Sequence, residues 1–320
     1  MKGSRRRALA LLVIPLVVGA GFAADYPIKP VRIVVASAPG GGDDFTSRVL
    51  ADQLSVQLSQ QFVVENRPGA AGVIGQLSVA KAPPDGYTLL LAGGSMAGAR
   101  FVNANATYDL ARDFTPISTI ETSPFVLIVN AALPVRSLKE FMNHAHARPG
   151  KLSYATTGAG QIPYWAALLL NKMAGIEAVE VPYKNGGETI TDVISGRVDY
   201  TFAPLVVAVA VKDKVRILGV SSAGRSEALP DAPSIAEAGL PGYEMPGWRS
   251  IMGPAGMPSD VVAILNRAIQ RALTSPDLRD RYLKAGSTPL GGTPEELRTR
   301  YEDWSMIFGK IAKDNNLKPQ

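Results

Sequence analysis

The chain of 320 residues contains no cysteine and only two histidines. The absence of cysteine excludes disulfide bonds, thiolate metal sites, a cysteine nucleophile and a lipoprotein anchor. The two histidines, His144 and His146, lie near the end of a predicted helix, where a spacing of two residues places them on different faces. We therefore expect no metal centre and no cofactor, and a fold that depends on its hydrophobic core for stability.

A charge excess of one sign is also missing once the first residues are set aside. The formal net charge is +5, but residues 1–24 hold four basic residues and no acidic one. Removing these four from the 33 lysines and arginines leaves 29 basic residues against 28 acidic residues. A nearly neutral chain offers no charge support for nucleic-acid binding, so we expect no nucleic-acid partner.

The N-terminus has the pattern of a secretory signal peptide. Three arginines at positions 5–7 precede an apolar run at positions 8–20, which is too short for a comfortable membrane span. Small residues then give a cleavage site after Ala23 or Ala24. We expect residues 1–24 to be removed on export to the periplasm. The paired arginines leave a twin-arginine export signal open beside the general route.

A strand, a glycine loop and a helix follow one another near the start of the mature chain. The β-branched run at 31–36 predicts a buried parallel strand, and apolar residues at three- and four-residue steps predict a helix from Asp43 onward. Between them lies Pro39-Gly40-Gly41-Gly42. Glycines let the backbone approach a ligand, and the first turn of a helix presents free N–H groups with partial positive charge. The pattern predicts a site for a small anion, such as a carboxylate or phosphate.

A purely structural role for this loop is the alternative. Asp43 or Asp44 is a suitable helix N-cap, and the glycines could form only a turn. Two known nucleotide motifs do not fit: Phe45 breaks the G-x-G-x-x-G spacing, and no Gly-Lys-Ser/Thr follows.

Short apolar runs alternate with helical patterns along the rest of the chain, which predicts βαβ units and parallel sheets. The predicted strands are 31–36, 62–65, 87–92, 117–120, 125–130, 152–155, 179–181, 198–202 and 215–221. Further helices are predicted at 73–81, 138–147, 164–174, 188–195, 259–274, 276–285 and 294–314.

A second glycine loop, Thr156-Thr157-Gly158-Ala159-Gly160-Gln161, also leaves a predicted strand and enters a predicted helix. Ligands of open α/β sheets lie beyond the carboxyl ends of the strands. If the two halves of the chain face each other, the two glycine loops oppose one another across a cleft. This pairing predicts a small ligand that carries a carboxylate.

Several blocks of sequence carry a resemblance to one receptor family. They are Tyr26-Pro27-Ile28-Lys29-Pro30-Val31-Arg32, Pro39-Gly40-Gly41-Gly42, Val63-Val64-Glu65-Asn66-Arg67-Pro68-Gly69-Ala70, Pro84-Asp85-Gly86-Tyr87-Thr88-Leu89-Leu90, Pro149-Gly150-Lys151-Leu152-Ser153-Tyr154-Ala155, Val181-Pro182-Tyr183-Lys184, Leu229-Pro230-Asp231-Ala232-Pro233 and Glu237-Ala238-Gly239-Leu240-Pro241-Gly242-Tyr243-Glu244. In these blocks, and in their order, the chain resembles the Bug family, the TctC-type periplasmic receptors of tripartite tricarboxylate transporters. The resemblance covers nearly the whole mature chain.

The resemblance implies a type II periplasmic binding protein fold, in which two α/β domains joined by two crossovers hold a ligand in the cleft between them. Domain 1 would comprise 25–123 plus 246–320, and domain 2 would comprise 124–245. The implied function is that of a monomeric periplasmic solute-binding protein. It would deliver a small carboxylate or amino-acid-like ligand to the membrane subunits of a tripartite tricarboxylate-type transporter.

The resemblance also implies a set of ligand-binding positions, held largely through backbone N–H groups and hydroxyls. The first domain would supply Gly40, Gly41, Gly42, Asp43, Asp44 and Ser95. The second domain would supply Thr156, Thr157, Gly158, Gly160, Phe202, Ala203 and Pro204, with Tyr183 and Lys184 near the cleft.

The chain departs from the family pattern in three segments near the expected cleft. Asp43 stands where the family usually has threonine, which favours a ligand that has an amine or is less acidic than a di- or tricarboxylate. The alternative is that Asp43 caps the helix and faces solvent. Tyr164 and Trp165 could stack on an aromatic acid or pack under the loop, and Arg100 could reach a carboxylate or remain a solvated surface residue.

Two other functions remain as alternatives. Gly93-Gly94-Ser95-Met96-Ala97 nearly spells the nucleophile elbow of a serine hydrolase, but Ala97 replaces its final glycine and a histidine would have to reach Ser95. We therefore expect no enzymatic activity. A receptor that feeds a sensor or signalling system without transport would have the same sequence features.

Overall fold

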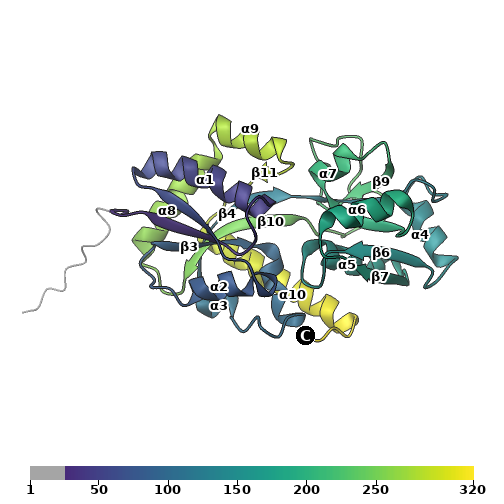
Figure 1. The fold of residues 1–320 in the computed structure, drawn as a ribbon, viewed down its shortest axis with the longest axis horizontal. Helices are drawn as coiled ribbons and strands as arrows, with labels where there is room; N and C mark the ends of the chain where they lie inside the picture. The colour runs from purple at the N-terminus through teal and green to yellow at the C-terminus, as the bar shows by residue number, and fades with distance from the viewer. Residues whose placement is uncertain (1–25) are drawn as a thin grey trace, which may run out of the picture.

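The computed structural model describes residues 26–320, so the predicted signal peptide and its cleavage site lie outside the described residues. The chain forms two α/β lobes that lie side by side along the long axis of the molecule (Figure 1). The strands are β1 Val31–Val35, β2 Phe62–Asn66, β3 Thr88–Gly93, β4 Phe114–Ser123, β5 Phe125–Asn130, β6 Leu152–Thr156, β7 Ala178–Pro182, β8 Tyr200–Pro204, β9 Val215–Val220, β10 Gly247–Pro254 and β11 Thr288–Pro289.

Helices cover both sheets and nearly all of them were expected from the apolar periodicity. The α-helices are α1 Gly42–Leu58, α2 Val73–Ala80, α3 Leu110–Asp113, α4 Leu138–His146, α5 Ile162–Ala174, α6 Gly186–Ser195, α7 Leu205–Ala210, α8 Ser259–Leu273, α9 Pro276–Lys284 and α10 Pro294–Asp314. Three short 3₁₀-helices are η1 Ala70–Gly72, η2 Gly94–Ala97 and η3 Ala99–Phe101. None of the helices within residues 26–320 combines the length and apolar character that a membrane crossing needs.

The two sheets share one topology. The first has the strand order β11-β4-β10-β3-β1-β2, and the second has the order β7-β6-β8-β5-β9. Strand β1 pairs in parallel with β2 and β3, and β6 pairs in parallel with β7 and β8. In the first sheet β10 runs antiparallel to β3 and β4, and the short β11 runs antiparallel to β4. In the second sheet β5 runs antiparallel to β8 and β9. The prediction of parallel sheets is wrong for these three strands. Strands β5 and β10 each enter their sheet directly from the other lobe without a helical crossover.

The chain passes between the lobes along two neighbouring strands. Strand β4 ends at Ser123 in the first sheet, and β5 begins at Phe125 in the second sheet. The return passage leads into β10, which pairs with β4 from Gly247 opposite Ser123 onward. The sequence predicted a crossover between the domains here, whereas the structure has the eight-residue strand β10. The residue boundaries predicted for the two domains stay a prediction.

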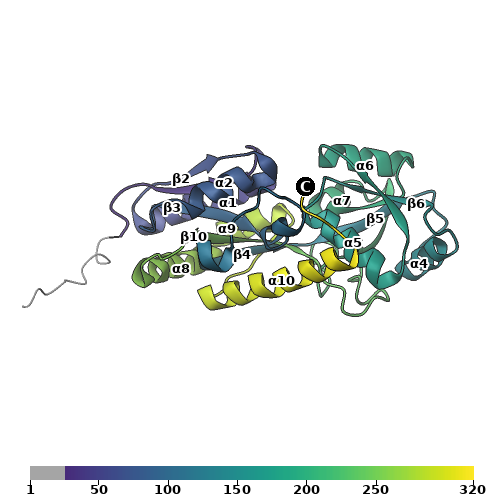
Figure 2. The same ribbon diagram turned by 90° about the horizontal axis from the view of Figure 1, so that it is seen from below.

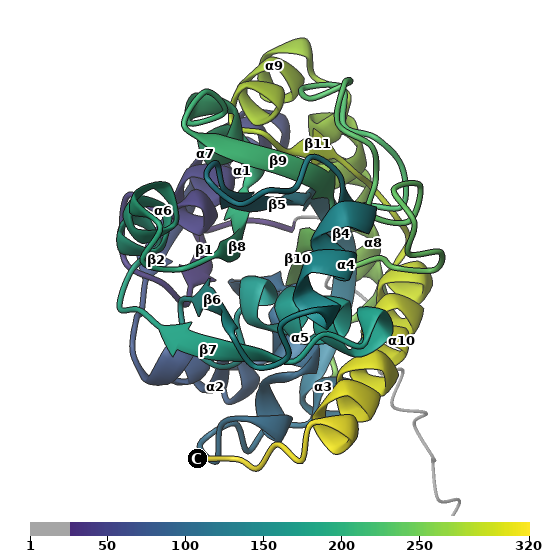
Figure 3. The ribbon, with the colours of Figure 1, turned by 90° about the vertical axis from the view of Figure 1, so that its right-hand side faces the viewer.

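Each sheet is covered on both faces by helices. In the first lobe, α1, α8 and α9 pack on one face, while α2 and α10 pack on the other. In the second lobe, α6 and α7 lie on one face and α4 and α5 on the other, as the end-on view shows (Figure 3). This coverage explains why most strands have continuous apolar runs, since both of their faces are buried.

The C-terminal helix α10 joins the cores of the two lobes. It starts on the first lobe and runs along the molecule toward α5 of the second (Figure 2). Trp165 on α5 and Phe308 on α10 have ring centroids 4.6 Å apart, and Lys172 lies 3.9 Å from Asp314. Trp165 is fully buried, so of the two roles considered for it the structure shows packing under the loop.

The start of α1 differs from the expected capping arrangement. The N-cap residue is Gly41, and no side chain caps it, so the prediction that Asp43 or Asp44 is the N-cap is wrong. The buried Asp44 carboxylate instead accepts the Gly40 N–H at 3.0 Å and pairs with Arg48 at 2.9 Å. Arg48 and the Gly40 N–H lower the pKa of Asp44 to about 2.

We expect Asp44→Asn to lower the free energy of unfolding at neutral pH by about 1–2 kcal/mol, because it removes charge-assisted hydrogen bonds to both partners. A folded-state pKa below the unfolded value stabilises the fold above the unfolded pKa. The difference between the two proteins should therefore disappear as the pH falls from about 4 to about 2. Urea denaturation at several pH values measures it.

Asp52→Asn is the matched control, since Asp52 also lies on α1 but its side chain is 65% exposed and pairs with Arg281 at 3.4 Å. Its stability effect should stay within about 0.5 kcal/mol. If the Asp44→Asn deficit persisted unchanged down to about pH 2, the assigned pKa of Asp44 would be wrong.

Candidate functional site

A cavity of about 360 Å³ lies between the lobes at the carboxyl ends of β1, β2 and β3. The residues that follow these strands line it from the first lobe. Phe125 and the start of α5 line it from the second lobe, and Gly247, Trp248 and Arg249 of β10 line it between them. This is the place where open α/β sheets bind ligands.

Helix N-termini without side-chain caps gather around the cavity. The N-cap residues of α1, α2, η2 and α5 are Gly41, Gly72, Gly93 and Gln161, and none of them makes a side-chain cap hydrogen bond. Side chains do cap α3, α4, α6 and α10, which begin elsewhere, although α7, α8 and α9 also lack such caps. Free N–H groups and partial positive charge from both lobes therefore surround the cavity, which suits an anionic group.

Three buried polar side-chain atoms in the cavity wall have no hydrogen-bond partner within residues 26–320. They are Ser37 Oγ, Gln76 Oε1 and Trp248 Nε1. Buried polar atoms are nearly always hydrogen-bonded in folded proteins, and leaving one unpaired costs about 1–3 kcal/mol. A polar ligand in the cavity can donate a hydrogen bond to Gln76 Oε1 and accept hydrogen bonds from Ser37 Oγ and Trp248 Nε1. None of these three residues is among the ligand-binding positions predicted from the sequence.

The loop after β2 has an unusual backbone where it meets the cavity. Ala70 and Ala71 have φ values of 48° and 54°, and Gly72 has φ of 94°. A Cβ atom at Gly72 would lie 3.2 Å from the Ala36 carbonyl oxygen, so this position needs glycine. Left-handed alanines cost about 1–2 kcal/mol each, and such strain concentrates at ligand-binding loops. The signal in the sequence is the run Pro-Gly-Ala-Ala-Gly at 68–72, of which the family block covers only the part up to Ala70.

Arg249 of β10 brings a cationic side chain to the cavity wall. It is not among the residues predicted from the sequence. Its Nε donates to Asp43 Oδ1 at 2.6 Å, and its Nη1 donates to Glu121 Oε1. Glu121 is fully buried in β4 and also accepts hydrogen bonds from Thr46 Oγ1 at 3.2 Å and Ser287 Oγ at 2.8 Å.

The charges of this cluster balance one another only in part. Burial alone would lower the pKa of Arg249, but the charges of Glu121 and Asp43 outweigh it and raise the pKa above the ordinary value. Arg249 is therefore always a cation. Two carboxylates share it, so the pair of Asp43 and Glu121 leaves one uncompensated negative charge beside the N-terminus of α1.

The structure places two of the predicted ligand residues in the cavity wall, Asp43 and Ser95. Gly40, Gly41 and Gly42 lie directly before Asp43, and a Cβ atom at Gly42 would come within 3.0 Å of Arg249 Nη2. The Gly40 N–H is already bonded to Asp44, which is buried and turned toward Arg48.

The predicted residues of the second glycine loop lie beside the cavity and not in its wall. Thr156 Oγ1 donates to Glu180 Oε1 at 2.6 Å and accepts the Gly158 N–H at 3.3 Å, so this hydroxyl stabilises its own loop. Gly158 and Gly160 have φ values of 101° and 92°. Thr157 stands between Thr156 and Gly158, and the loop reaches the cavity through Gln161.

The remaining predicted residues are not in the cavity wall either. Tyr183 donates from its hydroxyl to Asp192 Oδ2 at 2.8 Å, and Lys184 is exposed. Phe202 is buried against Tyr243, with ring centroids 6.2 Å apart, and its neighbours are the buried Ala203 and the exposed Pro204.

Two further sets of residues considered from the sequence lie outside this cavity. Arg100 lines a different cavity, under α10. His144 and His146 are on α4 and neither lines the cavity with Ser95; His146 Nε2 lies 2.7 Å from the Ala174 carbonyl oxygen. The described part of the chain has no group of three or more His, Cys, Asp or Glu side chains placed to hold a metal ion.

Comparison with known proteins gives relatives over nearly the whole chain. A family model described as tripartite tricarboxylate transporter family receptor, TctC, matches residues 46–317. A Pseudomonas sp. protein, described as the UPF0065 protein in the tcbD-tcbE intergenic region, is 35% identical over 98% of this chain and 95% of its own length. BugT from Bordetella pertussis is 32% identical over 98% of each chain.

Solved structures with the same fold include two with bound carboxylates. A Rhodopseudomonas palustris protein with adipate has a TM-score of 0.80 and 34% identity, covering 92% of this chain and 100% of that one. MatC from Rhodopseudomonas palustris, with bound malate, has a TM-score of 0.76 and 29% identity, covering 90% and 100%. The periplasmic binding protein BugD has a TM-score of 0.77 and 29% identity, covering 92% and 100%.

These matches agree with the geometry described above: two lobes of one topology, two strand crossovers, and a cavity at the strand ends between the lobes. The fold is that of type II periplasmic binding proteins, as the resemblance implied. On both the family model and the full-length relatives, the chain belongs to the TctC family of tripartite tricarboxylate transporter receptors, whose members are periplasmic solute-binding proteins.

Proposed function

We propose that this protein is exported to the periplasm, captures a small carboxylate-containing metabolite in the cavity between its lobes, and delivers it to the membrane subunits of a tripartite tricarboxylate-type transporter. The observation that carries the proposal is the set of uncapped helix N-termini that meet at the cavity from both lobes. A ligand that bridges both sets of N–H groups has differential affinity for the closed arrangement of the lobes. It therefore shifts the population toward the form that a membrane partner can recognise.

The chemistry of the cavity supports a carboxylate held mainly by backbone groups. Ser37, Gln76 and Trp248 offer hydrogen bonds that no described residue uses. Among residues 26–320, Arg249 alone brings a guanidinium to the cavity wall, and this group is already paired with Asp43 and Glu121. Relatives solved with adipate and malate support the same ligand class. In this proposal Ser95 and the amides after Gly40 contact the ligand from the first lobe, and the loop at 156–161 contacts it from the second.

In this proposal the ligand itself accommodates the negative charge of Asp43. The uncompensated carboxylate beside α1 disfavours a second full negative charge at this end of the cavity. An amine on the ligand would neutralise it, as would a less acidic group. The first candidates are therefore an amino-acid-like carboxylate or a monocarboxylate with a neutral polar end.

Binding can be tested on the mature protein with a thermal-shift screen of carboxylates and amino acids that includes adipate and malate. A ligand that binds only the folded state, at a concentration of about 100 times its Kd, stabilises it by about 2.7 kcal/mol and raises the melting temperature. We expect at least one carboxylate to do so. We expect Ser95→Trp to abolish that shift, because the indole would fill the cavity.

The control is Ser195→Trp, since Ser195 is exposed at the end of α6 and does not line the cavity. It should retain the shift in full. A screen without any stabilising carboxylate would contradict the proposal, and so would a ligand that stabilises Ser95→Trp as well as the natural sequence.

Asp43→Thr tests the role assigned to the charge cluster. Removing this carboxylate frees one edge of Arg249 and removes one negative charge, so we expect the affinity for plain dicarboxylates such as malate and adipate to rise by about tenfold. Isothermal titration calorimetry measures the change. Asp260→Asn, in the first turn of α8 away from the cavity, should leave every affinity unchanged. Unaltered dicarboxylate binding in Asp43→Thr would refute the assignment.

A further inference from the structure

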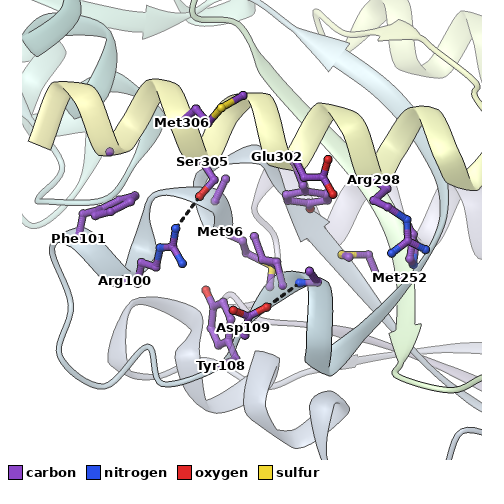
Figure 4. A pocket seen from close by; sticks show the side chains of 16 residues that line it. Met96, Arg100, Phe101, Tyr108, Asp109, Met252, Arg298, Glu302, Ser305 and Met306 are labelled. Carbon is purple, nitrogen blue, oxygen red and sulfur yellow. Dashed lines mark hydrogen bonds between the residues drawn. The ribbon is translucent and has the colours of Figure 1, made fainter.

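A second cavity, of about 470 Å³, lies in the first lobe between α10 and the segment that runs from η2 to α3 (Figure 4). It shares one lining residue, Met96, with the cavity between the lobes. Its volume is within the range of small-molecule sites, which begins at about 300 Å³. The proposed transport function makes no use of this cavity.

The inner wall of the second cavity is apolar and adaptable. Met96 and Met252 are buried in it, and the exposed Met306 of α10 lies at its edge. Methionine side chains are flexible and polarizable, and they adapt to ligands of irregular shape. Together with Phe101 and Pro116 they form a lining that suits the apolar part of a small molecule.

One buried polar group points into this apolar space. Tyr108 is only 6% exposed, and its hydroxyl has no hydrogen-bond partner within residues 26–320. Figure 4 shows the hydroxyl directed toward the side of the cavity on which Arg100 lies. Burial raises the pKa of Tyr108, so the phenol keeps its proton and can donate a hydrogen bond.

Arg100 supplies a cation on the same side. Its guanidinium donates to Ser305 Oγ at 3.1 Å and lies 4.9 Å from the ring centre of Phe101, and no described carboxylate forms an ion pair with it. The acidic residue Asp109, also in the wall, caps α3: its Oδ1 accepts the N–H groups of Ala111 and Arg112 at 3.0 Å. The other charged residues of the wall, Arg298 and Glu302, come from α10 (Figure 4).

We propose that this cavity is a second binding site, for a small apolar molecule with one carboxylate at its end. The carboxylate contacts the Arg100 guanidinium at the mouth and accepts the hydrogen bond of the Tyr108 hydroxyl. The apolar part lies against Met96 and Met252. This site takes a different class of ligand from the cavity between the lobes, whose walls carry helix N-termini and polar groups for a ligand with polar atoms throughout.

Octanoate is a suitable probe, with octanol as the uncharged comparison. By isothermal titration calorimetry we expect octanoate to bind the mature protein more tightly than octanol. We expect Arg100→Gln to weaken octanoate binding by about tenfold or more, through loss of a charge-assisted contact. Arg267→Gln is the matched control, since Arg267 is exposed on α8 and does not line this cavity. It should change the affinity by less than about twofold, as is usual for an exposed charge without a direct contact.

Methionine methyl NMR locates the probe. Octanoate should shift the methyl signals of Met252 and Met306, which line the second cavity alone, and leave Met142 and Met173, in the other lobe, unchanged. A shift confined to Met96, or octanoate that adipate displaces, would place the probe in the cavity between the lobes and overturn the inference. Absence of binding, or equal affinity in Arg100→Gln, would also overturn it.

Tyr108→Phe separates a ligand contact from a structural role. Without ligand the variant should be at least as stable as the natural sequence, because it removes a buried hydroxyl that has no partner. Its affinity for octanoate should fall by about fivefold, since a neutral hydrogen bond contributes about 1 kcal/mol. Unchanged affinity in a stable Tyr108→Phe variant would exclude the hydroxyl as a ligand contact.

Discussion

The buried carboxylate of Glu121 is the constraint around which the junction of the two lobes is arranged. A charge without exposure to water needs a partner and hydrogen bonds, and Glu121 has Arg249 together with Thr46 and Ser287. These residues come from β4, β10, α1 and the segment before β11. One ionic group therefore fixes the first turns of the ligand-facing helix against both strands that connect the lobes.

This arrangement explains why Asp43 can stand at a site proposed for anions. The partial positive charge at the N-terminus of α1 attracts negative charge, and the Asp43 carboxylate already lies beside it. The Asp43 side chain is still 43% exposed. Arg249 holds Asp43 in place and is itself held by Glu121, so the cation is not free for a ligand. Under the proposed function, selectivity then depends on which chemical group an incoming molecule brings to Asp43, while the backbone N–H groups supply the general affinity for a carboxylate.

Local patterns predicted most of this fold, whereas contacts across the chain could not be predicted from them. The strand, glycine loop and helix at 31–58 were recognisable from β-branched residues, three glycines and a helical apolar stripe. Strand β10 was not predicted because Arg249 and Ser250 interrupt its short apolar run, glycines and a proline lie at its ends, and its partners are far away in the sequence. For the same reason the role of Arg249 could not be predicted, because Arg249 meets Glu121 only when β10 pairs with β4. The positive φ values of Ala70 and Ala71 are equally hidden, since alanine does not predict them.

The short helix η2 separates the cavity between the lobes from the cavity under α10, and its composition fits that position. Ser95 faces the polar cavity between the lobes, Ala97 faces the apolar cavity under α10, and Met96 contributes to both walls. Gly94 allows the helix to lie directly against Trp248, because a Cβ atom there would come within 2.5 Å of the indole Nε1. A flexible methionine between two spaces of opposite polarity can adapt to a ligand on either side without moving the backbone. In the two proposals, the difference in wall chemistry, and not a difference in size, therefore separates the two classes of ligand.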